Sequence, residues 1–175
     1  SRERVHSAMK NCGYRYPVAA VVVNLAPADT KKEGSVYDLP IAIGMLAASL
    51  QIPYQSLKKP VIFGELSLNG EVRKVNGLLP MIISACQAGE KHFLIPEANA
   101  EEAAFIEGAE IYAVSTLNQA VEFVTGQSDL KPVQPRSWQN DLQFNHSDND
   151  FKYIKGQFAA KRAMEIAVAG GHNIL

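Results

Sequence analysis

The chain has 175 residues, of which 47% are apolar and 20% are charged, and its formal net charge is −1; this composition predicts one folded domain with additional sequence and excludes disorder throughout. The near-neutral charge gives no strong field toward nucleic acid or an anionic membrane, and no apolar run reaches the roughly 20 residues of a membrane helix. The lack of such a run leads us to expect a soluble protein with no membrane partner. Two cysteines are too few for a disulfide framework, so we expect the reducing cytoplasm as its compartment.

The first part of the chain predicts a helix, a strand and a second helix in that order. Residues 1–12 carry apolar side chains at helical spacing, and residues 17–27 form an apolar, β-branched run typical of a buried strand. After a charged turn, Asp38 is predicted to cap the next helix and Pro40 to lie in its first turn. Apolar residues then continue to Leu50, so this helix is expected to be central.

The middle of the chain predicts a hairpin and then alternating elements. In residues 61–75, Asn69-Gly70 separates two alternating runs, which is a strong hairpin signal. The expected helices that follow cover residues 77–89, 99–108 and 115–126, the last capped by Ser115 or Thr116, and the expected strands cover 92–96 and 110–114. This order predicts an α/β (α+β) domain over residues 1–126.

The composition changes after residue 126. Residues 127–150 contain two prolines, many Asn, Asp and Gln residues, and apolar residues without a period, which predicts a linker. Residues 151–175 predict a helix over about 157–169, a Gly-Gly turn and the beginning of a strand. We therefore expect this last segment to be the start of a second domain whose core partners lie elsewhere.

Three quoted stretches, in order, resemble one family. "KKEGSVYDLPIAIGMLAAS", "GELSLNGEVRKVNGLLPMIISACQAGEKHFLIPEANAEEAA" and "IKGQFAAKRAMEIAVAGGHNIL" look like the magnesium-chelatase-like AAA+ proteins of the YifB/ComM type. The resemblance implies that residues 1–126 form a two-layer domain like the proteolytic domain of Lon, without its N-terminal strands. It also implies that residues 151–175 begin an AAA+ (P-loop) module, because both ends look cut relative to the family.

The resemblance also locates the positions of a Lon-type Ser-Lys dyad. The serine falls at Val36 and the lysine at Leu79, and neither side chain can attack a carbonyl or accept a proton. A displaced dyad of Ser35 and Lys74 is the alternative, although Ser35 is one residue from the matched position and a strand lysine is usually only solvated. Asp38 stands where Lon has a glycine, and its carboxylate would oppose an oxyanion.

Nucleotide binding is expected only in a longer parent protein. By resemblance, Ile154, Gly156 and Gln157 match the AAA+ segment near the adenine, so ATP and magnesium are the expected cofactors of the parent. No G-x-x-x-x-G-K-[ST] motif occurs in these residues, so we expect no cofactor in the fragment itself and no ATP hydrolysis by it. The alternative interpretation of the three residues is a plain turn that opens a helix.

Basic residues around the first and last helices could contact DNA phosphates. The candidates are Arg2, Arg4, Lys161 and Arg162. The alternative is that they form the solvated faces of their helices. The histidines have no metal-ligand spacing, so no metal site is predicted. By resemblance, the parent would associate with itself as a hexameric ring and act on DNA.

These observations favour a non-catalytic Lon-like platform in a ComM/YifB-type AAA+ ATPase, the parent being a motor that remodels or translocates on DNA in natural transformation and recombination. This interpretation assigns no enzymatic activity to the fragment and ATPase activity to the parent. A peptidase of the Lon type with the displaced dyad is one alternative. A magnesium chelatase subunit is the other, suggested by the family's name alone.

Overall fold

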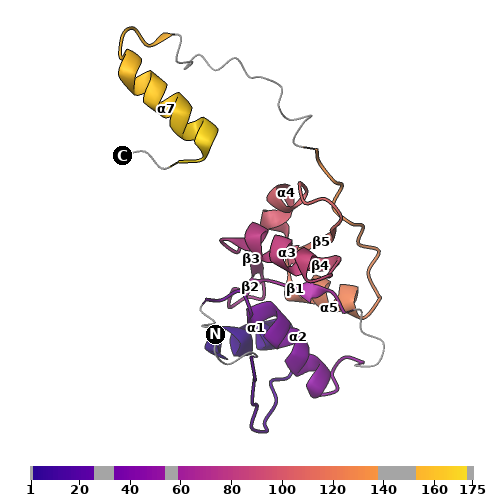
Figure 1. Cartoon of the computed structure of the whole chain (residues 1–175). Helices are drawn as coiled ribbons and strands as arrows, with labels where there is room; N and C mark the ends of the chain where they lie inside the picture. Colours follow the sequence, from indigo (N-terminus) through magenta and orange to yellow (C-terminus); the bar gives the residue numbers. More distant parts are fainter. Residues whose placement is uncertain (1, 26–33, 54–58, 138–152, 173–175) are drawn as a thin grey trace. The chain divides into compact units, whose positions relative to one another are not determined.

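The computed structural model describes residues 2–25, 34–53, 59–137 and 153–172. By internal contacts the chain divides into two compact units, Ser1–Arg136 and Ser137–Leu175, which are drawn in Figure 1. The predicted mixed α/β class is confirmed, because the first unit contains a small parallel sheet packed with helices. No helix in the described residues is long and apolar enough to cross a membrane.

The main sheet has three parallel strands in the order β1-β4-β5. These strands are β1 (Val61–Ile62), β4 (His92–Pro96) and β5 (Glu110–Val114). Phe93 at the centre of the sheet lies opposite Val61 on one side and Ile111 on the other. The predicted strands at 92–96 and 110–114 are therefore confirmed.

The predicted hairpin forms, but it is shorter than expected. β2 (Glu65–Leu66) pairs antiparallel with β3 (Val72–Arg73) around the Asn69-Gly70 turn. The expectation of one hairpin arm from residue 61 was wrong, because β1 leaves this ladder and pairs with β4. The chain changes sheets at Gly64, where an added Cβ would lie 2.9 Å from the Leu39 side chain. A periodic apolar run does not show where a strand exchanges one partner for another.

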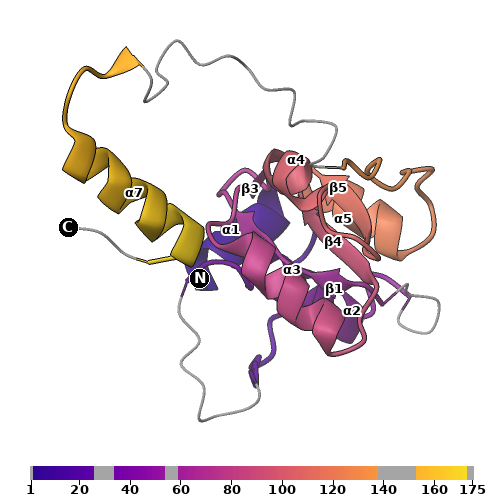
Figure 2. The ribbon, with the colours of Figure 1, turned by 45° about the horizontal axis from the view of Figure 1, so that its top comes forward.

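Helices occupy most of the expected positions. They are α1 (Arg2–Asn11), α2 (Asp38–Ala48), α3 (Leu78–Gln87), the 3-10 turn η1 (Glu97–Asn99), α4 (Ala100–Ala103) and α5 (Leu117–Val124). Of the two predicted caps for α5, the structure selects Thr116, whose hydroxyl accepts a hydrogen bond from the Gln119 N–H at 3.2 Å. Figure 2 shows the same elements after a 45° rotation.

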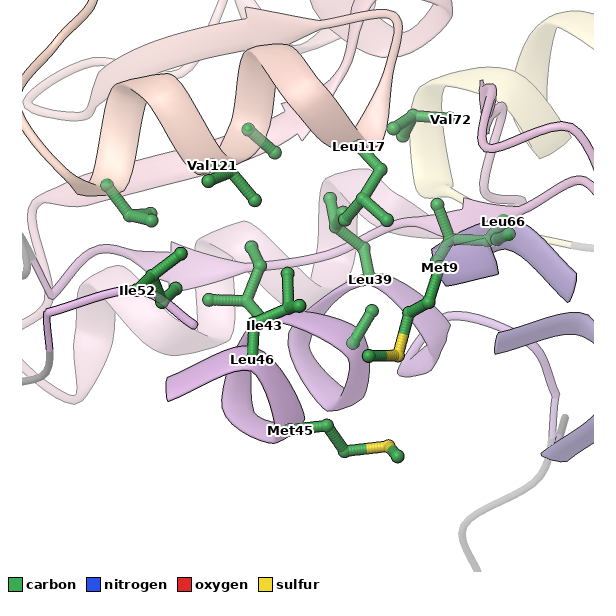
Figure 3. Packing of buried hydrophobic residues seen from close by; sticks show 14 of the residues in the cluster. Met9, Leu39, Ile43, Met45, Leu46, Ile52, Leu66, Val72, Leu117 and Val121 are labelled. Carbon is green, nitrogen blue, oxygen red and sulfur yellow. The ribbon is translucent and has the colours of Figure 1, made fainter. Parts of the chain in front are cut away.

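The core divides into two clusters that meet at β4. Leu94 belongs to the first cluster, with residues of α1, α2 and α5, part of which is shown in Figure 3. Phe93 and Ile95 belong to the second cluster, with residues of α3 and α4. Since successive strand residues point to opposite faces, β4 carries apolar side chains on both faces of the sheet. The segments that precede α2 and α3 both join the second cluster, through Val36 and Val75.

The predicted strand over residues 17–27 does not form within 17–25, and residues 26–27 lie outside the described residues. The stretch has no strand partner in the described part of the chain. The side chains of Val18 and Val22 are accordingly almost fully exposed instead of buried in a sheet. A strand needs a neighbour to accept and donate its backbone hydrogen bonds, and apolar composition alone does not supply one. This expectation was therefore wrong for the described residues.

The segment that begins the predicted linker packs on the first unit. Leu130 joins the first core cluster and Val133 the second. Val133 N–H donates to the Ile111 carbonyl at 2.7 Å, and Arg136 N–H donates to the Ala104 carbonyl at 2.9 Å. The second unit contains α7 (Phe158–Gly170), which follows a left-handed Gln157 and ends at Gly171. Residues 138–152 lie outside the described residues.

Candidate functional site

The start of α2 is the part of the fold where the resemblance places a nucleophile. Val36, at the matched serine position, is buried in the second cluster together with Val75 and Leu78. Leu79, at the matched lysine position, follows Leu78 in α3 and is half-buried. Val36 therefore contributes to the core, whereas Leu79 is a half-buried residue of α3 that follows the core residue Leu78.

Every backbone donor in the first turn of α2 is already occupied or absent. Asp38 N–H donates to the Ser35 carbonyl and Leu39 N–H donates to the Gly64 carbonyl, both at 3.0 Å. Pro40 has no N–H, and Ile41 N–H donates to the Tyr37 carbonyl at 3.0 Å. An oxyanion site needs preorganised donors that point at the reacting oxygen. This helix start offers none of its first N–H groups for that purpose.

Gly64 holds the same turn from the opposite side. Besides accepting from Leu39, it donates its own N–H to the Val36 carbonyl at 2.9 Å. A Cβ at this position would lie 2.9 Å from Leu39 Cδ2 and 3.0 Å from Val72 Cγ1, so only glycine allows this close approach without movement of its neighbours. The two reciprocal hydrogen bonds fix Val36 and Leu39 relative to the crossing between the two sheets.

Asp38 is not the helix cap that the sequence predicts. The capping position is Tyr37, which makes no side-chain cap, and Asp38 is the first helical residue. Its fully buried carboxylate accepts a hydrogen bond from Arg4 Nε on α1, with Nε and Oδ2 2.8 Å apart. The other oxygen, Oδ1, is buried without a hydrogen-bond partner among the described residues. The local pattern could not show this, because Arg4 lies 34 positions earlier in the chain.

Ser35 and Glu65 extend the charged group beside this ion pair. The Ser35 hydroxyl donates to a carboxylate oxygen of Glu65 on β2. The pKa of Arg4 is raised above its ordinary value, first by its hydrogen bond to Asp38 and then by the negative charges of Asp38 and Glu65, while burial acts in the opposite direction. The carboxylates therefore keep Arg4 charged and Ser35 engaged as a donor.

The structure does not join Ser35 to Lys74. Glu65, which accepts from Ser35, lies directly opposite Arg73 in the hairpin register. Lys74 is the next residue and is exposed, and successive residues of an extended strand point to opposite faces. Within the described part of the chain, no hydrogen bond or ion pair connects the two side chains. A lysine can activate a serine only within hydrogen-bond reach.

The four basic candidates have different surroundings. Arg2 is exposed on α1, whereas Arg4 is committed to Asp38. In the second unit, Lys161 Nζ donates to the Ile154 carbonyl, and Arg162 lies 3.1 Å from Glu165 in an exposed ion pair. Arg4 is thus the one member of the set whose charge is neutralised by a buried carboxylate.

The predicted nucleotide residues lie in the turn before α7. Gly156 and Gln157 both adopt left-handed backbone conformations, with φ of 71° and 53°. Such a conformation costs free energy for a residue other than glycine, so the Gln157 turn is under strain. The hydrogen bond from Lys161 Nζ to the Ile154 carbonyl ties the beginning of this turn to the helix. Ile154 and Gln157 are both exposed.

The two cysteines and the possible metal ligands among the described residues were the other candidates for a reactive site. Burial raises the pKa of the Cys12 thiol, which lowers the share of reactive thiolate at neutral pH. Both cysteines are free and half-buried. Across the described ranges, no group of three or more His, Cys, Asp or Glu side chains is placed to hold a metal ion.

Comparison with known sequences identifies the family. Residues 1–99 match the family described as subunit ChlI of magnesium chelatase, and residues 150–175 match a second family described as magnesium chelatase, subunit ChlI. The chain belongs to this family. Within it, the chain is of the ComM/YifB type: it is 40% identical over its whole length to competence protein ComM of Haemophilus influenzae and 38% identical to the uncharacterised protein YifB of Escherichia coli.

The ChlI-family chain covers 34% of the length of either of these two relatives. A partial similarity extends to Lon protease 2 of Bacillus subtilis, which is 29% identical over 135 residues, or 75% of this chain and 24% of that protein. This similarity agrees with the α/β architecture, and the first unit is a Lon-like domain. The ComM/YifB family is an AAA+ ATPase-like group.

Sequence reasoning missed two residues that shape the candidate site of this ChlI-family chain. Gly64 gives no local signal, because it stands inside an alternating run that reads as a strand. The sequence predicts Asn99 at the start of a helix, but its buried side chain hydrogen-bonds both backbone groups of Val75, with each hydrogen bond 2.9 Å long. The available signal was an asparagine three residues after the end of the strand at Pro96, in a turn where such side chains often satisfy backbone groups.

Proposed function

We propose that this chain is the non-catalytic Lon-like platform, with the beginning of the ATPase module, of a longer AAA+ protein that acts on DNA. The observation that carries the proposal is the start of α2, where Val36 is buried and no early N–H group is free. In this proposal the fold is retained, Val36 and Leu79 stand in place of the nucleophile and the base, and the N–H groups of Asp38, Leu39 and Ile41 are engaged in hydrogen bonds. The unit then serves assembly and guidance instead of bond cleavage.

The proposed DNA role is supported by the relative named as a competence protein. In this proposal the longer protein is a hexameric motor that remodels or translocates on DNA during natural transformation and recombination, in the cytoplasm. Arg2, Lys161 and Arg162 contact phosphates, because their side chains can reach solvent. Arg4 instead serves the fold through Asp38.

ATP and magnesium would bind to the longer protein. Ile154, Gly156 and Gln157 fit the role of residues beside the base, because an exposed apolar side chain stands next to a strained turn at the start of α7. Hydrolysis of bound ATP would supply the free energy for movement on DNA. The residues of this chain would orient the base, and Lys161 would hold the turn with one N–H on the Ile154 carbonyl while its other N–H groups remain available to phosphate.

The DNA proposal is tested by fluorescence anisotropy with labelled single-stranded and duplex DNA at low and moderate salt. Binding that weakens with salt is expected. The triple variant Arg2→Glu, Lys161→Glu and Arg162→Glu should weaken it at least tenfold, because it reverses charges that neutralise phosphates. A matched control reverses three other exposed charges, at Lys74, Lys91 and Lys131, and so changes the net charge equally. Equal losses in both variants, or no binding of the original chain at low salt, would contradict the assignment.

The loss of peptidase chemistry has its own test. The double variant Val36→Ser and Leu79→Lys restores both side chains of the dyad, yet we expect no hydrolysis of fluorogenic peptides and no fluorophosphonate label at position 36, because the backbone donors remain occupied. Circular dichroism establishes that the variant is folded. The unaltered chain should likewise remain unlabelled at Ser35. Turnover by the double variant would show that the side chains alone were missing, and a label on Ser35 would revive the displaced dyad.

A further inference from the structure

The segment of residues 127–136, here called the strap, lies against the first unit after its last helix. β5 forms one edge of the three-stranded sheet, and an open sheet edge presents unpaired backbone groups. The strap meets this edge through the hydrogen bond from Val133 N–H to the Ile111 carbonyl. Pro132 and Pro135 lie on either side of Val133 and have no N–H of their own, so the strap cannot pair as a regular strand.

Arg136 fastens the end of the strap to the region of α4 through three kinds of contact. Its N–H donates to the Ala104 carbonyl, and Nη1 lies 3.1 Å from Glu101 Oε1. Its guanidinium carbon is also 5.4 Å from the centre of the Phe105 ring, within the range of a cation–π interaction. A carbonyl, a carboxylate and an aromatic ring from residues 101–105 thus all contact Arg136. That residue is the last of the first unit.

We infer that Arg136 is an anchor that holds the strap against β5 and α4 and fixes where the chain leaves the first unit. Without the side chain of Arg136, the carboxyl end of the strap would lose the ion pair and the cation–π contact but keep its backbone hydrogen bonds and the packing of Val133, so it would open more often from that end. With the side chain in place, a pull on the chain beyond residue 136 acts on α4 and β5 together. This mechanical consequence rests on the proposed motor function, whereas the anchor itself does not.

The individual interactions are modest, so their combination matters. Glu101 is largely exposed, and an exposed ion pair of this kind contributes little alone. The cation–π contact adds a second increment on the same side chain, and the two together are expected to shift the opening equilibrium of the strap about five- to tenfold. This range is measurable by hydrogen exchange, which reports local opening separately from global unfolding.

The test is residue-resolved amide hydrogen exchange by NMR on the 175-residue chain and on Arg136→Ala. Exchange at Val133 should accelerate about fivefold or more in the variant, while Leu94 in β4 should keep its rate. Lys131→Ala is the matched control, since Lys131 lies in the same strap, carries the same charge and is exposed. It should leave Val133 exchange unchanged.

Two further variants separate the contacts of the anchor. Glu101→Gln removes the ion pair alone and Phe105→Leu removes the aromatic ring alone, and each should accelerate Val133 exchange less than Arg136→Ala does. Unprotected exchange at Val133 in the original chain would overturn the inference, as would equal rates in Arg136→Ala and Lys131→Ala. Because the readout is exchange in the absence of DNA, failure of the DNA proposal leaves this result unaffected.

Discussion

Replacing Arg4 with methionine is expected to lower the free energy of unfolding by about 3 kcal/mol, near the lower end of the range for breaking a buried ion pair. The variant keeps most of the apolar stem but leaves the Asp38 carboxylate fully buried without its cation. The lower end applies because Arg4 is 36% exposed and some water can enter in its place. Urea unfolding followed by circular dichroism measures the change.

The ion pair predicts an asymmetry that distinguishes it from general damage to the core. Asp38→Asn leaves only Arg4 without its charged partner, and the Arg4 side chain can reach water. The free energy of unfolding should therefore fall by about 1 kcal/mol, the contribution of one hydrogen bond. The double variant Arg4→Met with Asp38→Asn should recover part of the loss, because no buried charge remains. Arg2→Met, on the exposed part of the same helix, is the control and should change stability by less than about 0.5 kcal/mol. Equal losses for the two single variants would contradict this account.

Elements with local signals were predictable from the sequence. The Asn69-Gly70 turn requires a backbone conformation that favours glycine, and Gly70 does have a φ of 82°. Thr116 caps α5 because its hydroxyl reaches an N–H three residues later, which is also a local property. Both strands of residues 92–114 follow from short apolar runs between polar turns. In these cases the residues that decide the structure are neighbours in sequence.

Features that depend on distant partners were not predictable. Residues 17–25 have strand-like composition but no strand partner in the described part of the chain, and residues 61–66 divide between two sheets at Gly64. The candidate site shows the same limit. The resemblance predicts the positions Val36 and Leu79, but the hydrogen bond from Leu39 N–H to the Gly64 carbonyl joins residues far apart in the sequence, which a local pattern does not indicate. Side-chain identity at these two positions therefore does not reveal which backbone N–H groups at the start of α2 are engaged in hydrogen bonds.

Asn99 couples the segment before α3 to the end of β4. Replacing it with alanine is expected to lower the free energy of unfolding by about 3 kcal/mol. Alanine leaves two buried polar groups without partners, and each such group costs about 1–3 kcal/mol. The amide oxygen of Asn99 accepts from Val75 N–H and its Nδ2 donates to the Val75 carbonyl, so one side chain satisfies both backbone groups of a buried residue. Urea unfolding measures the loss, and Asn118→Ala on the exposed face of α5 is the control.

A second substitution separates hydrogen bonding from size. Asn99→Asp has nearly the same shape and can still accept from Val75 N–H, but its carboxylate cannot donate to the Val75 carbonyl and places a negative charge against that oxygen. It should therefore cost at least as much stability as alanine at neutral pH. Because Val75 lies four residues before Leu79, both variants should also increase amide exchange at the start of α3. Native stability in Asn99→Asp would show that the two hydrogen bonds do not hold this segment.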